Sequence, residues 1–79
     1  MAPVSRTVPL HRLKPGERAQ VVELRSDSPA RLDRLGALGL LPGSWIVLQQ
    51  LHPALVVRVG ETELSVDRSV AAEIMVRRA

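Results

Sequence analysis

The turn sequence Leu-x-Pro-Gly occurs twice, at residues 13–16 and 40–43. In each copy, proline presets the backbone angle of the first central position of the turn. Glycine then supplies the positive φ that a type II turn requires at the second. A run containing several valine, leucine or isoleucine residues follows each copy, so we expect each turn to lead into a strand. Pro15, Gly16, Pro42 and Gly43 are therefore predicted to be structural turn residues.

The stretch between the two turns has the signals of one helix. Ser28 is suited to the N-cap and Pro29 to the first helical position, where the missing N–H of proline costs nothing. Leucines at positions 32, 35 and 38 recur at every third residue and form an apolar stripe. Gly39 fits the position just after a helix, where a positive φ is needed. We expect a helix from Pro29 to Leu38.

The remaining segments are predicted to be strands. Residues 18–25, 44–51, 54–59 and 62–66 are bounded by turn signals, and Gly60 starts a two-residue hairpin loop. Asp67 is suited to cap a short helical turn through Ala72, before a last strand from Ile74 to Val76. This order indicates a mostly β fold with one helix after the first strand and a helical turn before the last. A small five-stranded barrel is the expected closure, because it removes exposed sheet edges.

The strand at 44–51 is apolar on both of its faces. Trp45 and Val47 belong to one face, and Ile46 and Leu48 belong to the other. One face therefore needs a cover, and the helix, the opposite wall of the barrel or another chain could supply it. Whether Trp45 fills the core or is exposed stays open at this point.

Length and composition narrow the class of protein. The 79 residues leave room for one domain, and the absence of cysteine excludes disulfides and thiolate metal sites. No apolar run approaches the roughly 20 residues of a membrane-spanning helix, and the N-terminus lacks the apolar region of a secretory signal. We expect a cytoplasmic protein without direct membrane insertion. Residues 1–8 are predicted to be a flexible tail, and residues 9–79 the folded domain.

No constellation of residues indicates catalysis or a dedicated metal site. His11 and His52 share no motif, and the serines lie in no nucleophile elbow. We predict no catalytic residue, no metal ligand and no cofactor, with weak binding of a transition metal left open as an alternative. The net charge of +3 could suit nucleic acid or an acidic membrane surface. Eight carboxylates are interleaved with the arginines, which favours an ordinary solvated surface and makes nucleic acid an unlikely partner.

Two stretches resemble the FeoA family. They are Leu10-His11-Arg12-Leu13-Lys14-Pro15-Gly16 and Arg34-Leu35-Gly36-Ala37-Leu38-Gly39-Leu40-Leu41-Pro42-Gly43, and the ending from Leu64 to Val76 is similar to that family as well. The resemblance implies an SH3-like barrel and a non-catalytic cytosolic accessory of bacterial ferrous iron uptake. It also implies protein contact with the cytosolic part of the ferrous iron permease FeoB, which would hold the domain beside the inner membrane.

The candidate contact residues are Arg31, Arg34, Leu38 and Leu41, because basic and apolar groups close together suit a protein interface. A second copy of the chain is another candidate occupant of this surface. Two alternative functions stay open. One is a metal-responsive regulatory domain, since the resemblance extends to domains fused to metal-dependent repressors. The other is a basic barrel that binds nucleic acid.

Overall fold

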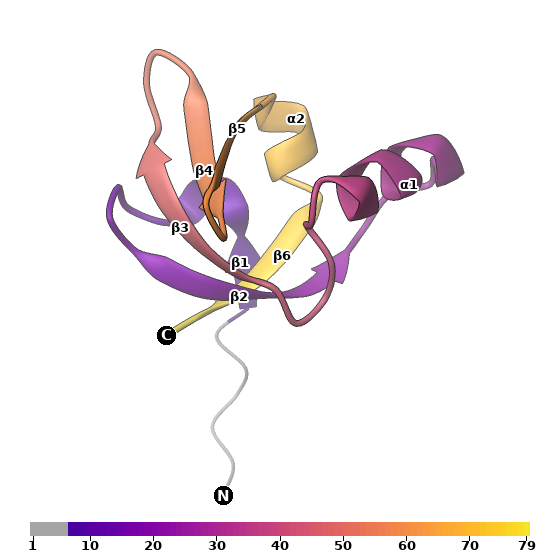
Figure 1. Ribbon diagram of the computed structural model, residues 1–79, viewed down its shortest axis with the longest axis horizontal. Coiled ribbons are helices and arrows are strands. Elements are labelled where there is room, and N and C mark those ends of the chain that lie inside the picture. Colours follow the sequence, from indigo (N-terminus) through magenta and orange to yellow (C-terminus); the bar gives the residue numbers. More distant parts are fainter. Residues whose placement is uncertain (1–6) are drawn as a thin grey trace, which may run out of the picture.

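The computed structural model describes residues 7–79 as one antiparallel sheet with short helices between its strands (Figure 1). The sheet has six strands in the order β1-β6-β2-β3-β4-β5. The strands are β1 (Thr7–Pro9), β2 (Arg18–Leu24), β3 (Trp45–Gln50), β4 (Leu55–Val59), β5 (Thr62–Val66) and β6 (Ile74–Arg78). The helical elements are the 3-10 turn η1 (Leu10–Arg12), the helix α1 (Pro29–Ala37) and the short helix α2 (Arg68–Ala71).

The strand count and the closure differ from the expected five-stranded barrel. The sheet has six strands and does not close, so β1 and β5 remain its two edges. The additional strand is β1, which pairs with β6 and places Val8 opposite Val76. No strand pairing joins the two edge strands within residues 7–79. Instead, η1, which follows β1, contacts α2, which follows β5, and Leu10 and Ala71 are fully buried.

The N-terminal boundary of the domain also differs. Thr7 and Val8 belong to β1, although both were assigned to the expected tail, and Val8 packs against the core. The rest of that tail, residues 1–6, lies outside the described residues. Neither residue sits in an alternating apolar run long enough to indicate a strand, so pairing with β6 decides their conformation.

The helix and both turns form as expected. The Ser28 side chain accepts a hydrogen bond from the Arg31 backbone N–H at 3.2 Å, which caps α1, and the helix ends at Ala37. Gly39 has a φ of +93° just beyond the helix. In the two turns, Glu17 N donates to Lys14 O and Ser44 N to Leu41 O, each at 2.9 Å. The turn glycines have positive φ, as a type II turn requires: Gly16 at +90° and Gly43 at +98°.

The last helical turn forms where it was expected, with one difference at its start. Asp67 occupies the N-cap position of α2, but its side chain makes no capping hydrogen bond. β6 then extends through Arg78, beyond the expected end at Val76. The longer strand is explained by its two neighbours, since β1 pairs with Arg77 and β2 with both Arg77 and Arg78.

The core lies on the concave side of the coiled sheet and is aliphatic. Ile46 and Leu48 point into it from β3, whereas Trp45 is on the outer face and 45% exposed. The inner face of β3 is therefore covered by the rest of the coiled sheet and by the helices. Fully buried side chains of the core include Leu10, Leu13, Val21, Leu40, Ile46, Leu48, Val57, Ile74 and Val76.

Candidate functional site: a groove beside helix α1

Helix α1 presents three of the four predicted contact residues along one side. Arg31, Arg34 and Leu38 are spaced by three and four residues, so they follow one another on the same face of the helix. The Ser28 cap and the proline after it set where the helix begins, and Leu35 anchors the helix in the core at 5% exposure. The local signals of the sequence thus determine which side chains face outward.

A groove of about 380 Å³ opens between α1 and the segment that runs from β5 into α2. Figure 1 shows these two walls on the same side of the molecule, away from the chain ends. The groove is lined by Ser28, Ala30, Arg31, Arg34, Leu35 and Leu38 from one wall and by Ser65, Val66, Asp67 and Val70 from the other. Its surface combines an apolar floor with charged side chains at the rim, which is the composition of many protein interfaces.

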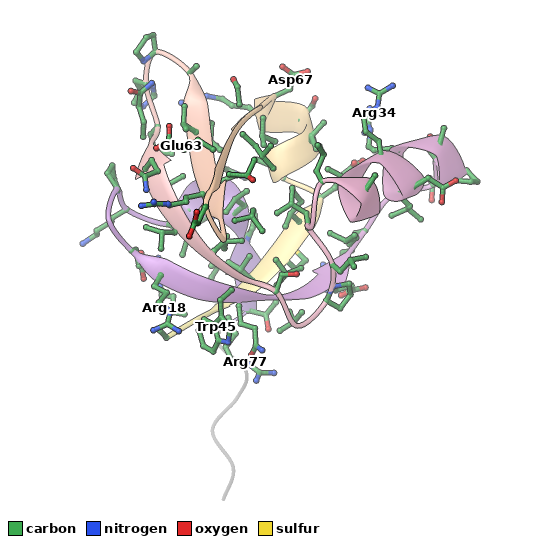
Figure 2. The ribbon with its side chains drawn as sticks, in the orientation of Figure 1. Arg18, Arg34, Trp45, Glu63, Asp67 and Arg77 are labelled. Carbon is green, nitrogen blue, oxygen red and sulfur yellow. The ribbon has the colours of Figure 1, made fainter. Side chains whose placement is uncertain are left out.

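The charges of the groove are only partly satisfied within the domain. Arg31 Nη1 donates to Glu73 Oε1 at 2.7 Å, and this ion pair connects α1 to the residue just before β6. The Arg34 side chain is exposed and has no hydrogen-bond or ion-pair partner among residues 7–79. Asp67 contributes a carboxylate to the opposite wall, and Figure 2 shows both side chains on the same side of the domain. Arg34 is therefore available to an external carboxylate.

The two predicted apolar contacts have different positions. Leu38 is 43% exposed and lines the groove, so it is not a core residue. Leu41 is 50% exposed but lies outside the groove, and its Cδ2 atom approaches Gly36 so closely that a Cβ there would be 3.1 Å away. The structure thus brings Arg31, Arg34 and Leu38 together and separates Leu41 from them.

The second wall of the groove was not anticipated from the sequence. Val66 and Val70 are spaced across the junction of a strand and a helix, and Asp67 was interpreted only as a cap. No local pattern indicates that these residues face α1, which precedes them by about thirty positions. The missing capping bond of Asp67 leaves its carboxylate free for the groove.

A separate charged cluster lies at the first turn. The Lys14 backbone N–H donates to Glu17 Oε1 at 2.9 Å, and Arg78 Nε donates to Glu17 Oε2 at 2.7 Å. The bond from the Lys14 N–H, followed by the contact with Arg78, holds the pKa of Glu17 below its ordinary value of 4.5. Arg78 also donates to the Arg12 carbonyl at 3.0 Å. This cluster ties the end of β6 to the first turn and is structural.

The two histidines have separate environments. His11 is half-buried in η1, and the exposed His52 contacts Arg68 Nη2 through its Nδ1 at 2.8 Å. Among residues 7–79, no three or more His, Cys, Asp or Glu side chains are grouped so that they could hold a metal ion. No helix in this part of the chain is long and apolar enough to cross a membrane.

The six-stranded sheet with its α1 groove defines a small antiparallel β domain with a surface groove that suits a macromolecular contact. The FeoA domain family model matches residues 8–78. The chain belongs to the FeoA domain family, and this membership supports a role in ferrous iron transport. A search of curated protein sequences found no match.

Solved structures agree with this assignment. The crystal structure of an iron uptake regulatory protein, FeoA, has a TM-score of 0.82 and 29% identity, with 92% of this chain and 97% of that chain covered. The FeoA protein from Chlorobium tepidum has a TM-score of 0.83 and 30% identity, with coverages of 90% and 70%.

A further neighbour, IdeR of T. acidophilum, has a TM-score of 0.87 at 24% identity. The match covers all of this chain but only 37% of IdeR. That likeness concerns the fold alone.

Proposed function

We propose that this domain is a non-catalytic cytosolic accessory of ferrous iron transport that binds the cytosolic part of an FeoB-type permease through the α1 groove. The family role in ferrous iron transport supports the choice of partner. The observation that carries the choice of surface is the unpaired Arg34 beside exposed Leu38 at the edge of a groove. A partner segment with an apolar side chain and a nearby carboxylate would satisfy both residues.

The arrangement of the groove supports a specific mode of contact. The Arg31–Glu73 ion pair connects α1 to the residue before β6, and buried Leu35 packs the helix against the core, so the α1 wall is in place before any partner binds. A preorganised surface loses less conformational entropy on binding than a mobile one. The groove is also open, which suits a protruding helix or loop of a partner better than an enclosed small molecule.

Co-purification with the cytosolic GTPase part of FeoB, with and without guanine nucleotide, tests the proposal. Arg34→Glu is expected to weaken binding by about tenfold or more, because a like-charge contact replaces an attractive one. Arg77→Glu on β6 is the matched control, since it makes the same charge change on an exposed arginine outside the groove. Both variants should keep the wild-type unfolding midpoint.

Two results would count against the proposed function. Absence of binding in every nucleotide state would exclude this partner, and sizing of the protein alone would then show whether a second copy occupies the groove. Equal loss of binding in Arg34→Glu and Arg77→Glu would show that net charge matters and that the groove does not.

A further inference from the structure

The outer face of the sheet carries the single aromatic residue of the chain in an exposed position. Trp45 begins β3, and the Cζ atom of Arg18 lies 4.4 Å from the centroid of its ring. This is a cation–π contact, which holds the guanidinium group over the face of the indole. Arg18 has no ion-pair partner among residues 7–79, so its N–H donors at the edge of the stack are free to bind an anion.

Strand register adds a second cation to this face. Gln20 of β2 is paired with Trp45 on one side and with Arg77 of β6 on the other. Side chains at paired positions project from the same face of a sheet, and neighbouring strands lie about 4.8 Å apart. The backbones of Trp45 and Arg77 are therefore about 10 Å apart. Figure 2 shows Arg18, Trp45 and Arg77 pointing away from the core.

We define Arg18, Trp45 and Arg77 as the outer-face patch. Arg77 is exposed and has no carboxylate partner in the described part of the chain. Arg58, the next cation on β4, is different because Glu63 of β5 lies directly opposite it. The patch therefore has an uncompensated positive charge beside an exposed indole, on a side of the domain opposite to Arg34 and Asp67 in Figure 2.

We propose that the outer-face patch binds the anionic headgroups of a phospholipid membrane. Guanidinium groups match phosphate oxygens with paired hydrogen bonds, and an indole ring prefers the headgroup level of a bilayer. The patch lies on the convex side of the sheet, which can rest on a flat surface. Single-stranded nucleic acid is less favoured, because its binding sites combine several stacking aromatics and the chain has one.

This inference goes beyond the proposed function, because FeoB takes no part in it. It concerns contact with headgroups and involves no insertion of the chain. The orientation would leave the α1 groove on the side away from the lipid, accessible to a protein. The two surfaces can be separated by mutation, since Arg34 belongs to the groove and Arg77 to the patch.

Trp45 makes the experiment direct, because all intrinsic tryptophan fluorescence of the chain comes from the patch. The full chain is titrated with vesicles of phosphatidylglycerol and, separately, of phosphatidylcholine. We expect saturable co-sedimentation and a blue shift of the emission with phosphatidylglycerol alone. Arg77→Gln should lower the partition coefficient by about fivefold. Binding should also be weaker at a salt concentration of about 0.15 M, where the Debye length is about 8 Å, than at low salt.

Arg34→Gln is the matched control, because it removes the same charge from the opposite side of the domain. It should leave lipid binding within about twofold of wild type, whereas Arg18→Gln combined with Arg77→Gln should reduce it by about twenty-five-fold. Circular dichroism of each variant checks that the fold is kept. Equal binding to both lipids, equal loss in Arg34→Gln and Arg77→Gln, or co-sedimentation without a Trp45 shift would overturn the proposal. Tighter binding of a single-stranded oligonucleotide than of vesicles would overturn it as well.

Discussion

Arg31 and Glu73 are 42 positions apart in the chain, and their side chains meet in a 2.7 Å ion pair that connects the first turn of α1 to the residue just before β6. Both side chains are about one third exposed, at 40% and 32%, so solvent screens much of their attraction. The pair nevertheless connects the helix to the sheet, and Arg31 itself lines one wall of the groove.

A double-mutant cycle on this pair should give a small favourable coupling. Arg31→Ala and Glu73→Ala are each expected to destabilise the domain, with a coupling energy of about 0.2–1 kcal/mol, typical of partly exposed pairs. Urea unfolding measures the four free energies, and raising the salt concentration should reduce the coupling. A coupling of zero at low salt would mean that the ion pair does not hold the helix.

Glu17 should make the stability of the domain depend on pH in the acid range. Its pKa in the folded state is held below 4.5 by the Lys14 N–H and by Arg78, so its contribution is fully present above about pH 4.5. The contribution is lost as the pH falls through the lower folded-state pKa, because protonation removes the two bonds. Chemical unfolding from neutral pH to about pH 3 should show a smaller loss of stability in Glu17→Gln than in wild type. Parallel curves for the two proteins would contradict this assignment.

Two glycines near the end of α1 should differ in how strongly replacement by alanine affects stability. Gly39 has a φ of +93°, and a Cβ there would lie 3.3 Å from Val59 Cγ1, so Gly39→Ala combines backbone strain with a close contact. We expect it to cost about 1–3 kcal/mol. Gly36 lies inside the helix, and its nearest obstacle is the exposed and movable Leu41 side chain at 3.1 Å. Gly36→Ala should change stability by no more than about 1 kcal/mol, since the gain in helix propensity offsets the contact.

Thermal unfolding of both variants measures this difference. The comparison is internally controlled, because the two substitutions are identical and three residues apart. A Gly39→Ala protein as stable as Gly36→Ala would show that the chain can relax at the helix end without penalty.

Ser44 should stabilise the second turn through its hydroxyl group. The Oγ atom donates to Gly39 O at 2.7 Å and accepts from Leu41 N at 3.2 Å, so it connects the end of the helix to the turn. Ser44→Ala is expected to cost about 1–2 kcal/mol, from two bonds of which one is short. Urea unfolding gives the value, and Ser69→Ala on α2, an exposed serine with no described bond, is the control. A cost no larger than that of the control would show that water replaces both bonds.

The parts of the fold that were predictable depend on residues close together in the sequence. The Pro-Gly turns, the Ser28 cap and the glycine at the helix end act within a few positions, and all of them form as expected. β1 has three residues and becomes a strand because β6 pairs with it, and no local pattern reports that pairing. Closure was expected from the cost of open edges, whereas in the structure η1 and α2 contact each other and bury Leu10 and Ala71.

For the candidate site as well, the sequence indicated the residues that are close together in the chain and missed those brought together by tertiary contacts. One wall of the groove contains three of the predicted contact residues, Arg31, Arg34 and Leu38, which were chosen because basic and apolar groups lie close together in the sequence. The other wall comes from the turn between β5 and α2, and its approach to α1 is a tertiary contact. Leu41 was grouped with these residues by proximity in sequence, but the turn after Gly39 directs it toward Gly36 instead.

The position of β6 has a consequence for the order of events during synthesis. β6 follows all the other strands along the chain, yet it lies inside the sheet between β1 and β2, with Ile74 and Val76 fully buried. When translation has reached α2, β1 and β2 have therefore been synthesised, but β6, the strand that lies between them in the sheet, has not. The domain can reach its final packing only after Arg78 has left the exit tunnel, so native folding of this chain must await the synthesis of its final strand.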